Sequence, residues 1–380
     1  MENSNKKRVI LIYLGHKGGH PPFAFKLAET LSRYAQLRVI LSENIANVDE
    51  WKASSLDVCF FSVPKTLKEL FNLKKVNVLL REIVKIIKEY KPDFILFTMI
   101  HPLNFLIKSR LRRKNIPIVS IIHDAVPHKG EKIWVKVIQK LEEKSSSHLI
   151  ALTNFSASVL KEKYRDRNKK IITLTHPIMN VSAKVEFNNE LRDYIKSISG
   201  NRFVFLFMGR IEKYKGLVYL LKAFSELLKN KSENVFLIVA GDGNLDSESV
   251  NLINEIGTTG KVLLINKFLS NSEVVTLFSV SDALVLPYID ASQSGVMSLA
   301  YNFQLPYITT SIQGLIEQSS YGLGGLIVPP GDFHSLASAM LMLAKNKTIY
   351  DLLKNEIVLA KQLPWNSWEY FVESLLKTVP

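Results

Sequence analysis

Short, unbroken apolar runs alternate with helix-patterned stretches along most of this 380-residue chain. Parallel strands that are buried on both faces read as such runs, and their alternation with helices is typical of βαβ units. The runs occupy residues 9–14, 39–41, 58–63, 94–97, 118–122, 149–152 and 170–174, and then 203–208, 235–240, 262–265, 283–286, 307–309 and 326–328. The sequence therefore predicts an α/β fold with two Rossmann-like, doubly wound domains of about 180 residues each.

Helix-like periodicity fills most of the intervals between these runs. The expected helices cover residues 22–33, 65–90 as one helix or two, 104–114, 132–144 and 156–164, and later 216–228, 248–256, 271–279, 295–302, 335–345 and 365–379. Residues 180–201 are rich in Asn, Ser and Gly and show little apolar periodicity. We therefore expect an N-terminal domain at 1–185, a linker at 186–201 and a C-terminal domain at 202–362.

The composition excludes two broad classes of protein. With 47% hydrophobic and 22% charged residues the chain can build real cores, which excludes global disorder. No window reaches the ~18–20 apolar residues of a spanning helix, because residues 94–107 are interrupted by His101, Pro102 and Asn104. Cys59 is the single cysteine, so no intrachain disulfide can form and a cytoplasmic location is expected.

Positive charge is concentrated in the first half of the chain. Residues 1–190 contain 33 Lys and Arg against 18 Asp and Glu, whereas residues 191–380 contain 16 against 17. Such an excess attracts polyanions, namely nucleic acid, anionic lipid or phosphorylated substrates. Residues 65–90 and 110–114 mix basic with apolar side chains, which favours peripheral docking on an anionic membrane, although solvated helix faces would look the same. Nucleic acid is not expected, because no exposed aromatics or recognition helix are grouped with these charges.

A short polar loop separates an apolar run from a helix between Pro287 and Tyr301. Ser292 and Ser294 supply hydroxyl groups, and Gly295 lets an anion approach the backbone at the start of the helix. This pattern predicts a phosphate site. An ordinary helix cap would use the same residue types.

Two basic residues follow the first apolar run of the second half. Arg210 offers a planar fork for phosphate oxygens, and Lys215 places a point charge just before Gly216 and the expected helix. Cations at a helix start oppose the helix dipole, so their position needs another reason, which a diphosphate would supply. A solvated basic loop is the alternative.

Two loops of the first half carry further candidates. The glycine-rich residues 15–19 follow the first apolar run, and His123-Asp124 follows another. Histidine can hydrogen-bond a sugar hydroxyl or handle a proton near neutral pH. A metal site would need more ligands than His128, the only further candidate nearby, so no metal is expected.

Taken together, these motifs resemble the nucleotide-sugar glycosyltransferases of family 4, which have the GT-B fold of two Rossmann-like domains facing across a cleft. The resemblance rests on the glycine-rich first loop, Gly209-Arg210 with Lys215-Gly216, Ala240-Gly241-Asp242-Gly243, Pro287-Tyr288, Ser292-Gln293-Ser294-Gly295-Val296 and Pro306. His123-Asp124 with Pro127-His128 and the Ser-Gln-Ser-Gly loop resemble one branch of that family.

The resemblance implies a role for each domain and for particular residues. The C-terminal domain would hold the sugar nucleotide, the N-terminal domain the acceptor, and a helix at 363–380 would pack back on the N-terminal domain. Catalytic contacts would come from His123 to the transferred sugar and from Arg210 and Lys215 to the diphosphate. The remaining sugar-nucleotide contacts would come from Gly18, Gly19, Gly209, Phe268, Gln293, Ser294, Gly295, Val296 and Glu317.

One departure from the family concerns its two glutamates eight positions apart. Ala291 and Leu299 stand there if Pro306 sets the register, or Ser292 and Ala300 if Gly295 does. The expected function is transfer of a sugar from a nucleoside diphosphate to a glycan or lipid-linked acceptor, with retention, in cell-surface polysaccharide or glycoconjugate biosynthesis. No cofactor beyond this co-substrate is implied. A sugar phosphorylase or a non-catalytic sugar-nucleotide binder remains the alternative, because the acidic pair is missing.

Overall fold

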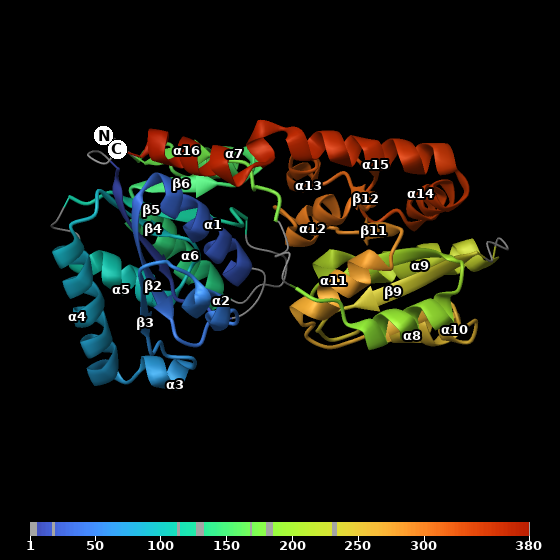
Figure 1. Cartoon of the computed structure of the whole chain (residues 1–380), viewed down its shortest axis with the longest axis horizontal. Helices are drawn as coiled ribbons and strands as arrows, with labels where there is room; N and C mark the ends of the chain where they lie inside the picture. Colours follow the sequence, from blue (N-terminus) through green and yellow to red (C-terminus); the bar gives the residue numbers. More distant parts are fainter. Residues whose placement is uncertain are drawn as a thin grey trace. The chain divides into compact units, whose positions relative to one another are not determined.

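Two parallel β-sheets organise the chain (Figure 1). The computed structural model describes residues 6–16, 20–111, 115–126, 133–167, 169–179, 185–229 and 234–379, without the side chains of residues 67 and 68. One compact unit, called unit 1 below, comprises Met1–His176 together with Ser367–Pro380, and unit 2 comprises Pro177–Asn366. Unit 2 is thus inserted, in sequence, between two parts of unit 1.

The seven-stranded sheet of unit 1 has the order β3-β2-β1-β4-β5-β6-β7. Its strands are β1 (Arg8–Tyr13), β2 (Gln36–Ser42), β3 (Val58–Phe61), β4 (Phe94–Phe97), β5 (Ile118–Ile122), β6 (His148–Ala151) and β7 (Lys170–Thr173). The register at its centre pairs Leu11 with Val39 on one side and with Leu96 on the other. Each apolar run expected in this half forms a strand, because an all-parallel sheet is buried on both faces.

Eight helices of unit 1 lie within the described residues. They are α1 (His20–Tyr34), α2 (Val48–Ala53), α3 (Leu67–Leu70), α4 (Leu73–Tyr90), α5 (Pro102–Leu111), α6 (Ile133–Ser145), α7 (Asn154–Lys163) and α16 (Trp368–Thr378). Residues 65–90 form two helices, because the side chain of Asn72 accepts a hydrogen bond from the N–H of Lys75 and caps α4. Helix α16 packs on α1, where the ring of Phe23 lies 5.1 Å from that of Trp368 (Figure 1).

The six-stranded sheet of unit 2 has the order β10-β9-β8-β11-β12-β13. Its strands are β8 (Phe203–Met208), β9 (Val235–Ala240), β10 (Val262–Ile265), β11 (Ala283–Leu286), β12 (Tyr307–Thr310) and β13 (Gly325–Val328). Its helices are α8 (Asn189–Ser199), η1 (Lys213–Lys215, a 3-10 turn), α9 (Leu217–Lys229), α10 (Ser247–Gly257), α11 (Asn271–Ser279), α12 (Gly295–Phe303), α13 (Gln313–Gln318), α14 (Phe333–Lys345), α15 (Lys347–Gln362) and η2 (Pro364–Asn366). The strand order places β8 and β11 side by side, so the loops that follow them leave the same edge.

The linker expected at 186–201 is wrong in its local structure. The side chain of Asn188 caps helix α8, which spans most of that interval, by accepting from the N–H of Leu191. Ile195 is fully buried in the core of unit 2, and Leu191 and Ile198 pack beside it. A single apolar stripe therefore anchors this helix even though its other faces are polar.

Candidate functional site

The loops after β8 and β11 are joined directly to each other. The N–H of Ile289, after β11, donates a hydrogen bond of 2.8 Å to the carbonyl of Tyr214, after β8. At Gly216, φ is +68°, and a Cβ there would lie 1.9 Å from the carbonyl oxygen of Pro287. Only glycine fits this close approach, so Gly216 fixes how near the two loops come.

Lys215 lies buried between these loops, with 8% of its surface exposed. Its Nζ donates a hydrogen bond of 2.7 Å to the hydroxyl of Tyr288, which lies 3.3 Å from Oγ of Ser294. The described residues provide no carboxylate partner for this ammonium. A buried charge that has only neutral partners carries an uncompensated desolvation cost, which an anion in this place would offset.

The N-terminus of α12 adds backbone donors near Lys215. Ser294 is its N-cap residue, but the Ser294 side chain makes no capping hydrogen bond. A Cβ built on Gly209 would lie 2.9 Å from Nζ of Lys215 and 3.6 Å from Cγ2 of Val296. Gly209, Lys215, Ser294 and Val296 are therefore brought together, and a helix N-terminus beside a buried ammonium is suited to an anion.

Gln318 is a residue of this site that the sequence did not indicate. Its Oε1 accepts a hydrogen bond of 2.6 Å from the N–H of Ser294, and its Nε2 donates to the Ser294 carbonyl at 2.8 Å and to Oγ of Ser298 at 3.3 Å. Gln318 is 5% exposed. A Cβ on Gly314, at the other end of α13, would lie 2.1 Å from the Ser292 carbonyl. Helix α13 thus holds the loop before α12 by its backbone.

Replacing Gln318 with glutamate is expected to weaken the site without unfolding unit 2. A carboxylate can still accept from the N–H of Ser294 but cannot donate to its carbonyl, which leaves a buried acceptor unpaired at a cost of about 1–3 kcal/mol. We expect a comparable loss of nucleoside-diphosphate affinity, measured by calorimetry. Gln313→Glu, on the exposed start of the same helix, is the matched control. Equal affinities for both variants would contradict a positioning role for Gln318.

The other residues predicted for unit 2 lie away from the Lys215 contacts. Arg210 is 71% exposed in its side chain and pairs with Glu212 at 3.7 Å. Phe268 is 62% exposed, and Gln293 is half-buried. Glu317 accepts a hydrogen bond of 3.2 Å from Nε2 of Gln313. These contacts do not reach Lys215, so their roles toward a sugar nucleotide stay predictions.

His123 ends β5 of unit 1 in a buried aromatic setting. Its Nε2 donates to the carbonyl of Thr98 at 3.0 Å, and its ring lies 4.4 Å from that of His20 and 5.1 Å from that of Phe23. Burial, with the charges of His20 and His176, lowers the pKa of His123 well below its ordinary value. A neutral imidazole that donates through Nε2 has Nδ1 as its acceptor, which suits a hydroxyl group rather than an anion. Gly18, Gly19 and His128 lie outside the described residues.

Acidification is expected to destabilise unit 1 through its neutral histidines. Burial, with the charge of His16, lowers the pKa of His101 to about 4. Because an unfolded histidine titrates at about 6.5, the unfolded chain binds more protons below that pH. The free energy of unfolding should therefore fall between about pH 6.5 and 4, by roughly 3 kcal/mol for His101 alone.

Urea unfolding followed across this pH range tests the histidine contribution. The Nδ1 of His101 accepts from the N–H of Leu103 at the start of α5, and asparagine can make the same cap without titrating. His101→Asn should flatten the slope. An unchanged slope in this variant would mean that other groups control the acid sensitivity.

Among the residues that the structure describes, no group of three or more His, Cys, Asp or Glu side chains could hold a metal ion. Within the same ranges, no helix is both long and apolar enough to cross a membrane.

Comparison with known proteins places these features among sugar-transferring enzymes. Residues 189–357 match the family model described as glycosyl transferases group 1. A crystal structure of HepE from Anabaena, in complex with UDP and glucose, superposes with a TM-score of 0.75 over 98% of this chain and 99% of HepE, at 16% identity. The predicted GT-B architecture of two parallel-sheet units is confirmed by this likeness.

Two enzymes are similar in sequence over shorter or weaker matches. The capsular polysaccharide biosynthesis glycosyltransferase CapM of Staphylococcus aureus is 26% identical over 50% of this chain and 51% of its own length. The GalNAc-alpha-(1->4)-GalNAc-alpha-(1->3)-diNAcBac-PP-undecaprenol alpha-1,4-N-acetyl-D-galactosaminyltransferase of Campylobacter jejuni is 22% identical over 72% of this chain and 71% of its own.

Proposed function

This chain belongs to the glycosyl transferases group 1 family through residues 189–357 of unit 2, and from that premise we propose that it transfers a sugar from a nucleoside diphosphate to a glycan or lipid-linked acceptor. As a glycosyltransferase it breaks the bond between the anomeric carbon and the β-phosphate oxygen. The acceptor hydroxyl forms the new bond and loses its proton, and the nucleoside diphosphate leaves as an anion.

The buried Lys215 carries the proposal for the sugar-nucleotide site. Negative charge develops on the β-phosphate as the bond breaks, and a preorganised ammonium stabilises it more in the transition state than in the ground state. The backbone N–H groups of Gly295 and Val296, at the start of α12, would add to this effect. Arg210, which is exposed and paired only with Glu212, would supply a second cation by a change of side-chain rotamer.

The sugar itself would be held by neutral groups. Ala291 and Leu299 in one register, and Ser292 and Ala300 in the other, leave no carboxylate where the family has its acidic pair. We therefore assign the sugar contacts to Gln293 and to the neutral His123, with Phe268 on the base and Glu317 on the ribose. Retention of anomeric configuration is part of the same proposal and rests on the family.

A lipid-linked acceptor is favoured by the charge of the chain and by one relative. The excess of Lys and Arg lies in residues 1–190, and the Campylobacter enzyme is named for an undecaprenol-diphosphate-linked glycan. We propose peripheral action at the cytoplasmic face of an anionic membrane, in cell-surface polysaccharide or glycoconjugate biosynthesis.

Release of nucleoside diphosphate from a panel of sugar nucleotides tests this function. UDP-glucose is the first candidate, because structures of HepE were determined with it. We expect release that depends on added membrane extract, with a labelled sugar recovered in the lipid fraction. Binding without release would favour a non-catalytic sugar-nucleotide protein, and phosphate-dependent formation of a sugar 1-phosphate would favour a phosphorylase.

A further inference from the structure

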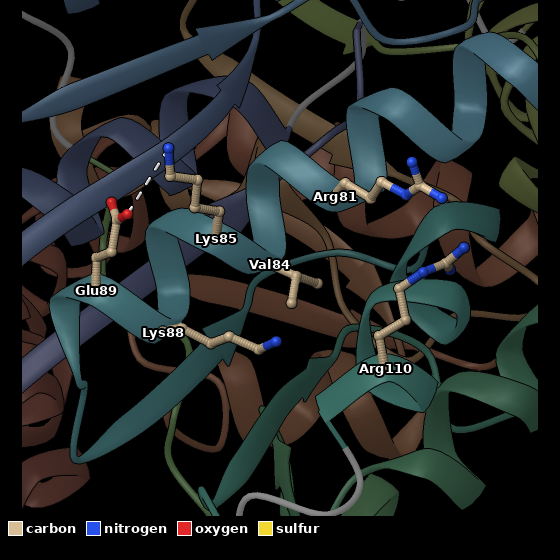
Figure 2. A pocket seen from close by; sticks show the side chains of 6 residues that line it. All are labelled: Arg81, Val84, Lys85, Lys88, Glu89 and Arg110. Carbon is tan, nitrogen blue, oxygen red and sulfur yellow. Dashed lines mark ion pairs between the residues drawn. The ribbon is translucent and has the colours of Figure 1, made fainter.

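A shallow groove with a basic lining lies between α4 and α5 of unit 1 (Figure 2). It is far in the fold from any residue assigned above, on helices that cross between strands rather than on the loops after them. Six side chains line the groove, namely Arg81, Val84, Lys85, Lys88, Glu89 and Arg110.

The cations of this groove outnumber their acidic partners. Lys85 turns toward Glu89, 3.9 Å away, while Arg81 and Arg110 extend to a common side of Val84 (Figure 2). In the described structure, Arg81 and Lys88 form no ion pair. Like charges gathered on one surface repel each other, and a phosphate group between guanidinium forks removes that repulsion.

Arg110 is held in place without losing its charge. One guanidinium nitrogen donates to Oδ1 of Asn77 on α4 at 2.6 Å, and the other donates to the Leu106 carbonyl at 3.3 Å. Both partners are neutral, so the positive charge stays available. The side chain is thereby ordered across the gap between α4 and α5, which lowers the entropy lost when an anion binds.

The same helix face carries apolar side chains that have no cover. Phe71 and Leu73, at the start of α4, are 77% and 72% exposed, and Val78 is 54% exposed. Val78 stands in one helical stripe with Arg81, Lys85 and Lys88, at spacings of three and four residues. Large apolar groups beside lysines and arginines on an amphipathic helix are typical of a surface that lies in a lipid headgroup layer.

We propose that this surface, formed by the start of α4 and the groove against α5, docks on an anionic bilayer. Lipid phosphates occupy the groove between Arg81 and Arg110, and Phe71 and Leu73 enter the boundary of the acyl chains. The inference deepens the proposed function, on which its choice of a membrane partner rests. A nucleic acid would use the same charges but gains nothing from isolated aliphatic tips, because stacking needs paired aromatic faces.

Vesicle co-sedimentation of the full chain tests the docking surface. The vesicles are phosphatidylcholine alone or phosphatidylcholine mixed with phosphatidylglycerol, at low salt. We expect binding only to the mixed vesicles, and Arg81→Gln with Arg110→Gln should weaken it roughly 30-fold. Phe71→Ser with Leu73→Ser should weaken binding in a way that added salt does not mask, because the apolar contribution is not screened.

A matched control removes the same charge elsewhere in unit 1. Lys161→Gln with Arg165→Gln changes two exposed cations on and after α7 and should leave vesicle binding within about two-fold. Equal losses in both double variants, or no binding to the mixed vesicles, would overturn the proposal. So would tight binding of random RNA or DNA that the groove variants abolish while vesicles do not bind.

Sugar-nucleotide binding, measured by calorimetry, separates this inference from the proposed function. The groove variants should keep the wild-type affinity for the sugar nucleotide and lose vesicle binding, and circular dichroism verifies their fold. If no sugar nucleotide binds even to the wild type, the proposed function fails while the vesicle result still decides the docking surface.

Discussion

Lys215→Met is expected to lower kcat/KM by roughly 30-fold to 900-fold, which corresponds to about 2–4 kcal/mol of transition-state stabilisation. The ammonium lies within the site and its recorded hydrogen-bond partner is the hydroxyl of Tyr288, so its full charge is available to the leaving diphosphate. Methionine keeps most of the buried volume and removes the charge. The free energy of unfolding should therefore stay equal or rise, since a desolvated ammonium with neutral partners is unfavourable in the absence of ligand.

Lys213→Met is the matched control for this prediction. Lys213 lies two positions earlier in the same turn, but its side chain is exposed. The variant has the same change in net charge and should alter kcat/KM less than about two-fold. Arg210→Ala tests the second proposed cation separately. Wild-type turnover in Lys215→Met would remove the diphosphate assignment, and equal losses at both lysines would point to net charge alone.

Gly216→Ala is expected to destabilise unit 2 by about 4 kcal/mol or more. The added methyl group would lie 1.9 Å from the Pro287 carbonyl oxygen, and the backbone has a φ of +68°. Relief requires the loops after β8 and β11 to separate, which would also break the hydrogen bond from Ile289 to Tyr214. Urea unfolding measures the change in stability, and calorimetry with the nucleoside diphosphate measures the loss of the site.

Gly260→Ala isolates the steric part of this effect. Gly260 has a φ of +64°, and nothing lies within 4 Å of a Cβ built there. Backbone strain alone should cost about 1–2 kcal/mol at this position. A similar cost at both glycines would show that the two loops can move apart freely, and would contradict a rigid site.

Strands of this chain were predictable because each is buried on both faces. Residues 94–97 and 203–208 were expected as strands and form β4 and β8 with those limits. Helix α8 was missed because the apolar stripe of Leu191, Ile195 and Ile198 is diluted by polar neighbours. Helix periodicity is a weaker signal when only one narrow face is buried.

Chemistry at the site was predictable by residue type but not by depth. A lysine before a helix pointed to phosphate, yet its burial depends on Tyr288, 73 positions away. Gln318 carried no sequence signal, because its hydrogen bonds reach a backbone 24 positions earlier. Such contacts exist only after the sheet has aligned both loops at one edge.

The insertion of unit 2 within unit 1 has a consequence for the order of folding during synthesis. Helix α16 supplies Trp368 and Phe371, whose rings pack on Phe23 of α1, and it leaves the ribosome only after all of Pro177–Asn366. Unit 2 is continuous and can fold as it emerges, while α1 must wait with an apolar face uncovered. The nascent chain therefore completes its sugar-nucleotide half before its membrane-facing half.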